Sequence, residues 1–257
     1  MSGKLSGKRA VVTGGGTGIG RGIAGCLARE GATVIVTGRR AELLAETVSG
    51  IEGSGGKASA EAFDVTDREA VAAAMQKIAD EGGIDVLVNN AGVGGPNACA
   101  MDGPDRWDEI VRPNLDGMFY CSQEALRHMP DGSRVINISS VLGRFGVPGY
   151  TAYCASKHGV IGFTKALALE VAARKITVNA ICPGWVETEM ARDGMKLLGE
   201  ALGVDYDAAR KEALAQVPIG RILEPEEVGD LIVYMASEAA AGMTAQAVSI
   251  CGGSTMV

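Results

Sequence analysis

The chain has 257 residues, of which 47% are apolar but only 4% aromatic, and its formal net charge is −7. No linker-like stretch divides it, so we expect one domain over residues 1–257. The negative charge, with no basic block or stripe, argues against nucleic acid as a partner. Neither a run of about 18 apolar residues nor a signal-like amino terminus occurs, so we expect neither a membrane span nor export.

The cysteines give no sign of a metal site. They contain no CxxC pair, and the two histidines do not stand at ligand spacing. Scattered structural thiols are therefore the expected role, and they suit a reducing cytoplasm. The six are Cys26, Cys99, Cys121, Cys154, Cys182 and Cys251.

The amino-terminal segment predicts a strand, a glycine turn and a helix. The β-branched run at residues 8–13 is followed directly by GGGTGIG at 14–20 and by a helical stretch to Glu30. Glycines let a backbone approach a pyrophosphate, and a helix amino terminus offers it free N–H groups. A glycine cluster by itself is also compatible with a plain tight turn.

A second predicted strand, residues 33–37, ends at Gly38-Arg39-Arg40. Dinucleotide folds meet the adenine ribose here, where an acid would bind the 2′-hydroxyl of NAD and an arginine a 2′-phosphate. We therefore favour NADP(H) over NAD(H), with Arg39 as the phosphate partner. The alternative is that Arg39 and Arg40 only solvate the start of a helix.

The next segments predict a helix over 41–57, a third strand over 59–65, a helix over 67–80 and a fourth strand over 84–92. Asp64 closes the third strand, where an acid is also a common helix cap. The fourth strand ends in Asn89-Asn90-Ala91-Gly92, whose last two residues are small enough for a ligand to lie against them.

The middle of the chain contains a helical region over 102–129, which we expect Pro104 and Pro113 to break. Asn114 lies inside it, and asparagine is unfavourable in mid-helix. It has either a specific task or a satisfied helical position. The apolar run 134–138 then predicts a buried strand that delivers Ser140 at its carboxyl end, where open α/β sheets place their chemistry.

Tyr153 and Lys157 lie four residues apart in a predicted helix that runs to Ala173, so they share one face. A free tyrosine titrates near about pH 10, and a neighbouring ammonium favours the phenolate. The pair therefore predicts a proton donor and acceptor tuned toward neutral pH. A tyrosine and a lysine at this spacing also occur by chance.

The last third predicts a strand over 176–182, one or two mobile helices over 189–217, a helix from Pro225 and an edge strand over 247–253. Strands and helices thus alternate along the whole chain. This alternation predicts an α/β fold with a doubly wound, Rossmann-type, seven-stranded parallel sheet.

Taken together, these motifs resemble the short-chain dehydrogenase/reductase family from end to end. The resemblance rests on TGxxxGxG at 13–20, NNAG at 89–92, Ser140 and YxxxK at 153–157. It implies a catalytic tetrad of Asn114, Ser140, Tyr153 and Lys157, a substrate lid at 189–217 and a homotetramer. The implied cofactor contacts are Gly14, Thr17, Gly18, Ile19, Gly20, Arg39, Asp64, Val65, Asn90, Ala91, Gly92, Tyr153, Lys157, Pro183, Gly184, Val186 and Thr188.

The same resemblance implies the reaction. Tyr153 would protonate a carbonyl oxygen that Ser140 positions, while Lys157 lowers the Tyr153 pKa and Asn114 relays protons. The segment 178–188 is similar to 3-oxoacyl carrier-protein reductases and polyketide ketoreductases. The substrate expected is therefore a 3-oxoacyl thioester, either as a small molecule or bound to a carrier protein. The alternatives are a secondary-alcohol or hydroxyacyl dehydrogenase and a catalytically silent dinucleotide sensor.

Overall fold

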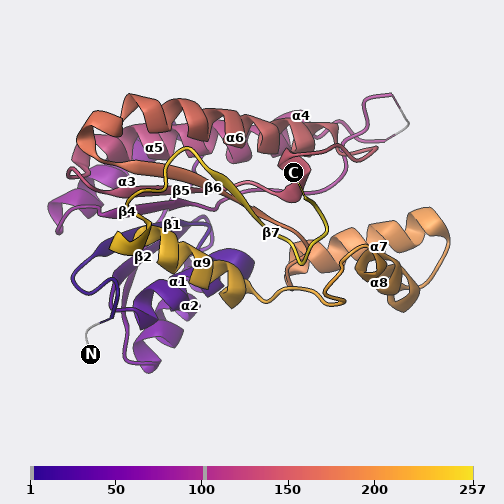
Figure 1. Cartoon of the computed structure of the whole chain (residues 1–257), viewed down its shortest axis with the longest axis horizontal. Coiled ribbons are helices and arrows are strands. Elements are labelled where there is room, and N and C mark those ends of the chain that lie inside the picture. Colours follow the sequence, from indigo (N-terminus) through magenta and orange to yellow (C-terminus); the bar gives the residue numbers. More distant parts are fainter. Residues whose placement is uncertain (1–2, 101–102, 257) are drawn as a thin grey trace.

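A seven-stranded sheet forms the centre of the computed structural model, which describes residues 3–100 and 103–256. Every neighbouring pair of strands is parallel, as predicted, and the strand order is β3-β2-β1-β4-β5-β6-β7 (Figure 1). The strands are β1 Arg9–Thr13, β2 Thr33–Gly38, β3 Lys57–Ala62, β4 Val86–Asn89, β5 Arg134–Ile138, β6 Thr177–Pro183 and β7 Ala247–Ile250.

Helices cover both faces of the sheet, because strands buried on two sides need an apolar layer on each. One layer consists of α1 Gly18–Arg29, α2 Ala41–Gly53 and α9 Pro225–Ala236, and the other of α3 Arg68–Asp80, α5 Gly117–His128 and α6 Thr151–Glu170 (Figure 1). Two glycines let α1 and α9 approach closely. A Cβ on Gly22 would lie 2.6 Å from Pro225, and one on Gly229 would lie 2.6 Å from the sulfur of Cys26.

The third strand is shifted toward the amino terminus relative to the prediction of residues 59–65. It comprises Lys57–Ala62, and its side chains are all either half-buried or exposed. An edge strand of this kind carries little apolar signal. Phe63 and Val65 are the apolar residues that led to the predicted end at residue 65, and both are buried in the turn that follows the strand.

The prediction that Pro113 would break the helical region was wrong. Helix α4, Trp107–Val111, continues through a π-helical turn, Arg112–Asp116, directly into α5. The wider turn accommodates a proline, which has no N–H to donate, and π-turns of this kind are frequent at functional sites. Short 3₁₀ turns lie at Val141–Gly143, Ala172–Arg174 and Glu238–Ala240.

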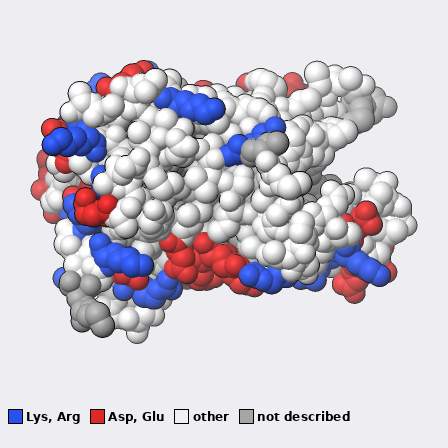
Figure 2. Space-filling view, viewed as in Figure 1, with Lys and Arg blue, Asp and Glu red and all other residues white. Residues whose placement is uncertain are grey.

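Two helices, α7 Glu189–Leu202 and α8 Tyr206–Ala215, occupy the segment predicted as a lid. They pack through a small cluster of their own, in which Met195, Ala213 and Ile222 are buried and Trp185 is half-buried. The pair projects beyond the sheet, and the molecular surface is hollowed between it and the segment before α4 (Figures 1 and 2). Within the described residues, none of the helices has the length and apolar character needed to cross a membrane.

Candidate active site

Ser140 is held in a tight turn directly after β5. It adopts an extended backbone, begins the 3₁₀ turn 141–143, and its Oγ accepts a hydrogen bond of 3.1 Å from the Leu142 amide. The turn packs against α6, because the Ser139 hydroxyl donates to the Lys157 carbonyl oxygen at 2.8 Å. A Cβ on Gly143 would lie 2.7 Å from that same oxygen, so the close approach requires glycine.

Tyr153 and Lys157 lie in the first two turns of α6, beside the Ser140 turn. Ser140 lies close enough to Tyr153 to influence the pKa of its phenol, and Lys157 Nζ lies 5.6 Å from the centre of the Tyr153 ring. Lys157 is 5% exposed, and its Nζ donates to the Ile138 carbonyl oxygen at 2.9 Å. The serine, the phenol and the ammonium therefore gather at the carboxyl end of β5.

The direction of the Tyr153 pKa differs from the prediction. Burial raises the pKa of the phenol to about 12, although the neighbouring Ser140 side chain lowers it. Burial also lowers the pKa of the Lys157 ammonium to about 8. The expected stabilisation of the phenolate is outweighed because the ammonium donates to the Ile138 carbonyl oxygen and because burial disfavours the charged forms of both groups. At neutral pH the phenol is thus protonated and able to donate.

Asn114 lies in the π-helical turn and is 2% exposed. Its Oδ1 accepts from the Val93 amide at 2.7 Å, and its Nδ2 donates to the Val93 carbonyl oxygen at 2.9 Å and to Ser156 Oγ at 3.1 Å. Ser156 in turn donates to the Tyr153 carbonyl oxygen at 2.8 Å. The Asn114 side chain therefore has its hydrogen-bonding groups satisfied, and it links the chain after β4 to the helix that carries Tyr153.

Gly92 joins this cluster to the predicted cofactor side. A Cβ on Gly92 would lie 2.9 Å from Asn114 Oδ1 and 3.5 Å from Lys157 Nζ. Ser156 was missed by sequence reasoning, since a serine three residues after a tyrosine carries no distinctive signal.

The glycine turn and the end of β4 interlock. Asn90 Nδ2 donates to the carbonyl oxygens of Thr13 and Gly14 at 2.9 and 3.2 Å, and the Ala91 amide donates to Thr13 Oγ1 at 3.0 Å. Gly14 has a φ of +66°, and a Cβ on it would lie 2.9 Å from the Ala91 Cα. A Cβ on Gly20 would lie 2.2 Å from the Gly14 oxygen, so both positions require glycine.

The start of α1 has the features that a dinucleotide pyrophosphate requires. Thr17 precedes the helix and makes no side-chain cap to any residue that the structure describes, and the first turn contains no acidic residue. Its first N–H groups can therefore serve an anion. Gly18, with a φ of +49°, lies against Thr188, whose Cγ2 would be 3.1 Å from a Cβ there. Ile19 is partly buried and packs against the apolar core.

The segment after β6 approaches this turn from the other side. Pro183 belongs to β6 itself, and Gly184 packs against Cys251 so closely that a Cβ would lie 3.0 Å away. Val186 is buried, and the Thr188 hydroxyl donates to the Val186 carbonyl oxygen at 3.1 Å and caps α7 by accepting from the Ala191 amide at 3.2 Å.

Arg39 and Asp64 lie together beyond β2 and β3. The Arg39 side chain is 71% exposed, and its Nη1 lies 3.8 Å from Asp64 Oδ2. Asp64 does not cap α3, because Asp67 does so by accepting from the Glu69 and Ala70 amides. The neighbouring Val65 is buried against Gly117 at the start of α5, where a Cβ would lie 2.6 Å from it.

The predicted residues therefore form two adjoining groups at one edge of the sheet. One is the tetrad, and the other is a glycine-lined cradle that fits a dinucleotide. Among residues 3–100 and 103–256, no three His, Cys, Asp or Glu side chains gather as they would around a metal ion.

The amino-acid sequence is similar to those of known proteins. A family model described as enoyl-(acyl carrier protein) reductase matches residues 14–255. The 3-oxoacyl-[acyl-carrier-protein] reductase FabG of Vibrio harveyi is 42% identical over 256 residues, covering 98% of this chain and 99% of the relative. The enzyme of the same name from Thermotoga maritima is 39% identical over 254 residues, covering 97% and 98%.

Solved structures show the same similarity. A variant of actinorhodin polyketide ketoreductase, crystallised with NADPH, superposes with a TM-score of 0.91 at 40% identity and 98% coverage of both chains. A short-chain dehydrogenase/reductase from Serratia marcescens superposes with a TM-score of 0.88 at 35% identity, covering 98% of this chain and 100% of that one.

Proposed function

The chain belongs to the short-chain dehydrogenase/reductase family, and from this premise we propose that it reduces a ketone to a secondary alcohol with NADPH. The observation that carries the proposal is the placement of Ser140 and Lys157 beside Tyr153 at the carboxyl end of β5, next to the dinucleotide cradle. A bound nicotinamide supplies the hydride. The alternative of a catalytically silent dinucleotide sensor is disfavoured, because Tyr153, Ser140 and Lys157 all lie within one cluster.

The side chains divide the remaining work. Ser140 binds and orients the carbonyl oxygen, and the protonated Tyr153 donates its proton to that oxygen. Lys157 binds the nicotinamide ribose and stabilises the phenolate that proton donation leaves. Asn114 fixes the Val93 and Ser156 ends of the cluster and passes protons from solvent toward Lys157.

The preference for NADPH is proposed from the end of β2. Gly38 offers no carboxylate to a 2′-hydroxyl, and the exposed Arg39 guanidinium can reach a 2′-phosphate. The similar polyketide ketoreductase was crystallised with NADPH.

Arg39→Ala tests this assignment. It should weaken NADPH binding by about 1.5–3 kcal/mol, the value of a charge-assisted contact, and leave NADH binding nearly unchanged. Arg40→Ala, next to it on the surface, is the matched control. A wild-type preference for NADH in paired kinetic assays would contradict the assignment.

The substrate proposed is a 3-oxoacyl thioester, carried on an acyl carrier protein in the manner that the names of the 39–42% identical relatives state. An acidic carrier would dock near the hollow between α7–α8 and the segment before α4, using the basic residues Arg112, Arg144, Arg192, Lys196 and Arg210. Arg127 lies in the last turn of α5, toward the amino ends of the strands, and cannot take part. Two of the five already have acidic partners: Arg192 with Glu187, and Lys196 with Asp193. Docking therefore has to compete with those pairs.

A substrate panel with both cofactors tests the class. Acetoacetyl thioesters should be turned over, with a kcat/KM that rises when the acyl group is on its carrier and falls with added salt. Preferential oxidation of simple secondary alcohols, without either effect, would indicate the alcohol dehydrogenase alternative. The absence of all thioester activity would end the preferred assignment.

A homotetramer is proposed as the assembly, as the family resemblance implies. Ala125, Leu167 and Val171 of the α5 and α6 region are buried against the sheet and cannot contact a partner. Phe119 is 38% exposed and stacks edge-on against Phe163, and Leu169 is 77% exposed. A light-scattering mass near 26.4 kDa at micromolar concentration would refute the tetramer.

A further inference from the structure

Among the residues that the structure describes, helix α6 begins without a side-chain cap, whereas at the start of α4 the Asp105 side chain accepts from the Trp107 amide at 3.0 Å. Tyr150 precedes α6 and Arg106 precedes α4, and neither makes a side-chain cap to another described residue. The first N–H groups of a helix have no intrahelical partner, so an uncapped start frays readily. This matters for α6, because Tyr153 lies in its first turn.

Asn97 lies where these two starts meet, and it is only 3% exposed. Its amide donates to the Gly149 carbonyl oxygen at 2.7 Å, and its Oδ1 accepts from the Arg106 amide. Its Nδ2 donates to Thr151 Oγ1 at 3.3 Å, and that hydroxyl donates back to the Asn97 carbonyl oxygen at 3.0 Å. One side chain thus joins the first residue of α6 to the residue that precedes α4.

We propose that Asn97 is a positioning residue for Tyr153, a role that rests on the proposed function. From another segment of the chain it hydrogen-bonds to the Thr151 hydroxyl and to the Gly149 carbonyl oxygen, and so holds the first helical turn of α6 in one place. Tyr153 is the third residue of that turn and can donate only if its phenol stays within hydrogen-bond reach of the carbonyl oxygen that Ser140 holds.

The placement of Asn97 relative to Asn114 supports this role. Asn114 hydrogen-bonds to Val93 and Ser156. Asn97, four residues after Val93, hydrogen-bonds to Gly149 and Thr151. The two asparagines therefore fasten the segment 93–97 to α6 on both sides of Tyr153. Buried amides satisfied in this way stabilise one arrangement of the segments that they join.

Asn97→Ala tests the proposal because it removes the side-chain bonds and keeps the backbone ones. We expect kcat for carbonyl reduction to fall about 10- to 100-fold, as for a small misplacement of a reacting group, with cofactor Kd within about twofold of wild type. Amide exchange at Cys154, whose N–H bonds to the Tyr150 oxygen at 2.8 Å, should become faster. This exchange measurement remains valid if no carbonyl substrate is found. It therefore separates failure of the role proposed for Asn97 from failure of the proposed function.

Asn179→Ala is the matched control. Asn179 is 1% exposed and joins β6 to a different segment, with Nδ2 donating to the Met243 oxygen at 2.7 Å and Oδ1 accepting from the Gln246 amide at 3.1 Å. It should lower Tm but leave kcat and Cys154 exchange unchanged. If Asn97→Ala does not fold, Thr151→Val removes the same link and Thr151→Ser should restore it.

Three results would overturn the proposal. The first is a kcat within twofold of wild type in Asn97→Ala or, should that variant not fold, in Thr151→Val. The second is unchanged exchange at Cys154 in that variant. The third is an equal loss of kcat in Asn179→Ala, which would show a general effect of disrupting a buried asparagine.

Discussion

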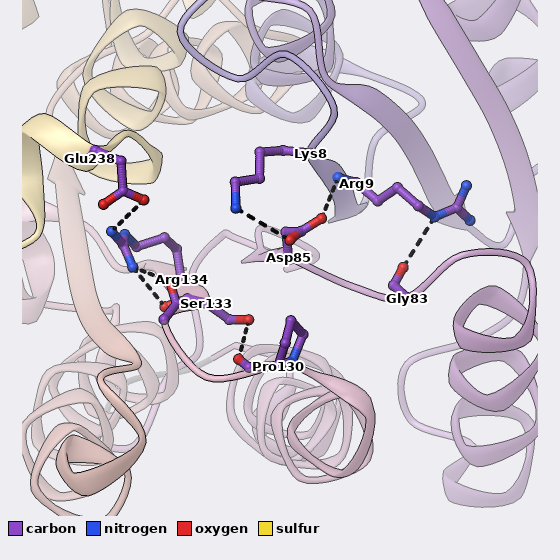
Figure 3. Close-up of polar contacts among 9 residues, drawn as sticks. Lys8, Arg9, Gly83, Asp85, Pro130, Ser133, Arg134 and Glu238 are labelled. Carbon is purple, nitrogen blue, oxygen red and sulfur yellow. Dashed lines mark hydrogen bonds and ion pairs between the residues drawn. The ribbon is translucent and has the colours of Figure 1, made fainter.

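The two ends of the same central strands are built from different interactions. At the amino ends of β1, β4 and β5, charged side chains link neighbouring strands (Figure 3). Asp85 accepts from the Arg9 amide at 2.8 Å and lies 3.5 Å from Lys8 Nζ, and Arg9 Nε donates to the Gly83 oxygen at 3.1 Å. Arg134 donates to the Ser133 oxygen at 3.2 Å and lies 3.5 Å from Glu238.

At the carboxyl ends of β1, β4 and β5, glycines and asparagine side-chain amides join neighbouring segments in place of charged side chains. Gly14, Gly20 and Gly92 admit close backbone approach, while Asn90 and Asn114 satisfy buried polar groups. The one buried ammonium there, Lys157, has its pKa lowered to about 8 by burial. The amino edge is thus organised for stability, and the carboxyl edge keeps N–H groups and a buried charge that serve the chemistry. Substitutions at the two edges should therefore have separable effects.

The largest separation is expected from Tyr153→Phe at the carboxyl edge. Removal of the proton donor should lower kcat about 10²–10⁴-fold, the usual value of general acid catalysis, while NADPH binding and Tm stay near wild type. Steady-state kinetics and cofactor fluorescence titration measure both quantities. Tyr234→Phe, a 42% exposed tyrosine on α9, is the control. Activity within tenfold of wild type would remove Tyr153 from the mechanism.

Burial of the Lys157 ammonium at the carboxyl edge should lower the stability of the folded protein at neutral pH. Its pKa is about 8 in the folded protein against 10.5 for a free lysine, so the unfolded chain binds more protons between these values. Stability should therefore rise with pH from about 8 toward 10, by roughly 2–3 kcal/mol from this group. Lys157→Met should abolish that rise in denaturant unfolding measured at pH 7.5 and pH 10. An equal rise in wild type and variant would show that another group causes it.

The sequence predicts some of these features of the structure and not others. The parallel sheet follows from the alternation of strands and helices along the chain. The tetrad and the glycine cradle follow from motifs that consist of a few residues at fixed spacing. The raised pKa of Tyr153 depends on how other segments bury the phenol, which no local pattern reports. The Asn97 contacts were missed for the same reason. Its partners Arg106 and Gly149 lie nine and fifty-two positions away in the sequence, and a Gly-Gly-Pro-Asn stretch predicts only a loop.

At the amino edge, Asp85→Ala should lower stability and leave catalysis intact. It removes a charge-assisted bond to the Arg9 amide and a contact with Lys8, so we expect a loss of about 1–3 kcal/mol in the free energy of unfolding. Thermal unfolding and kcat at a temperature well below Tm measure the two effects. A tenfold loss of kcat in the folded variant would contradict the division between the edges.

The smallest effect is expected from an ion pair on the rim of the carboxyl edge, where α9 begins. Arg221 contacts Glu227 at 2.6 and 2.9 Å, and this hydrogen-bonded pairing holds the pKa of the Glu227 carboxyl at about 2. A carboxylate whose pKa is lowered on folding stabilises the protein above its unfolded value of about 4.5, and that stability is lost as pH falls toward 2. The Arg221 and Glu227 side chains are 55% and 34% exposed, so solvent screening should keep the contribution below about 1 kcal/mol.

Glu227→Gln isolates this contribution. Its side-chain oxygen can still accept the bond of 2.8 Å from the Glu224 amide, so the capping box at the start of α9 is retained while the charge is lost. The variant should be slightly less stable than wild type at pH 7, and the difference should shrink as pH falls through 4.5 toward 2. Glu226→Gln, next to it in the first turn, is the control for loss of a carboxylate near the helix amino terminus. If Glu227→Gln destabilises by 2 kcal/mol or more, ion pairs support the carboxyl edge as strongly as the amino edge, and the contrast between the two edges fails.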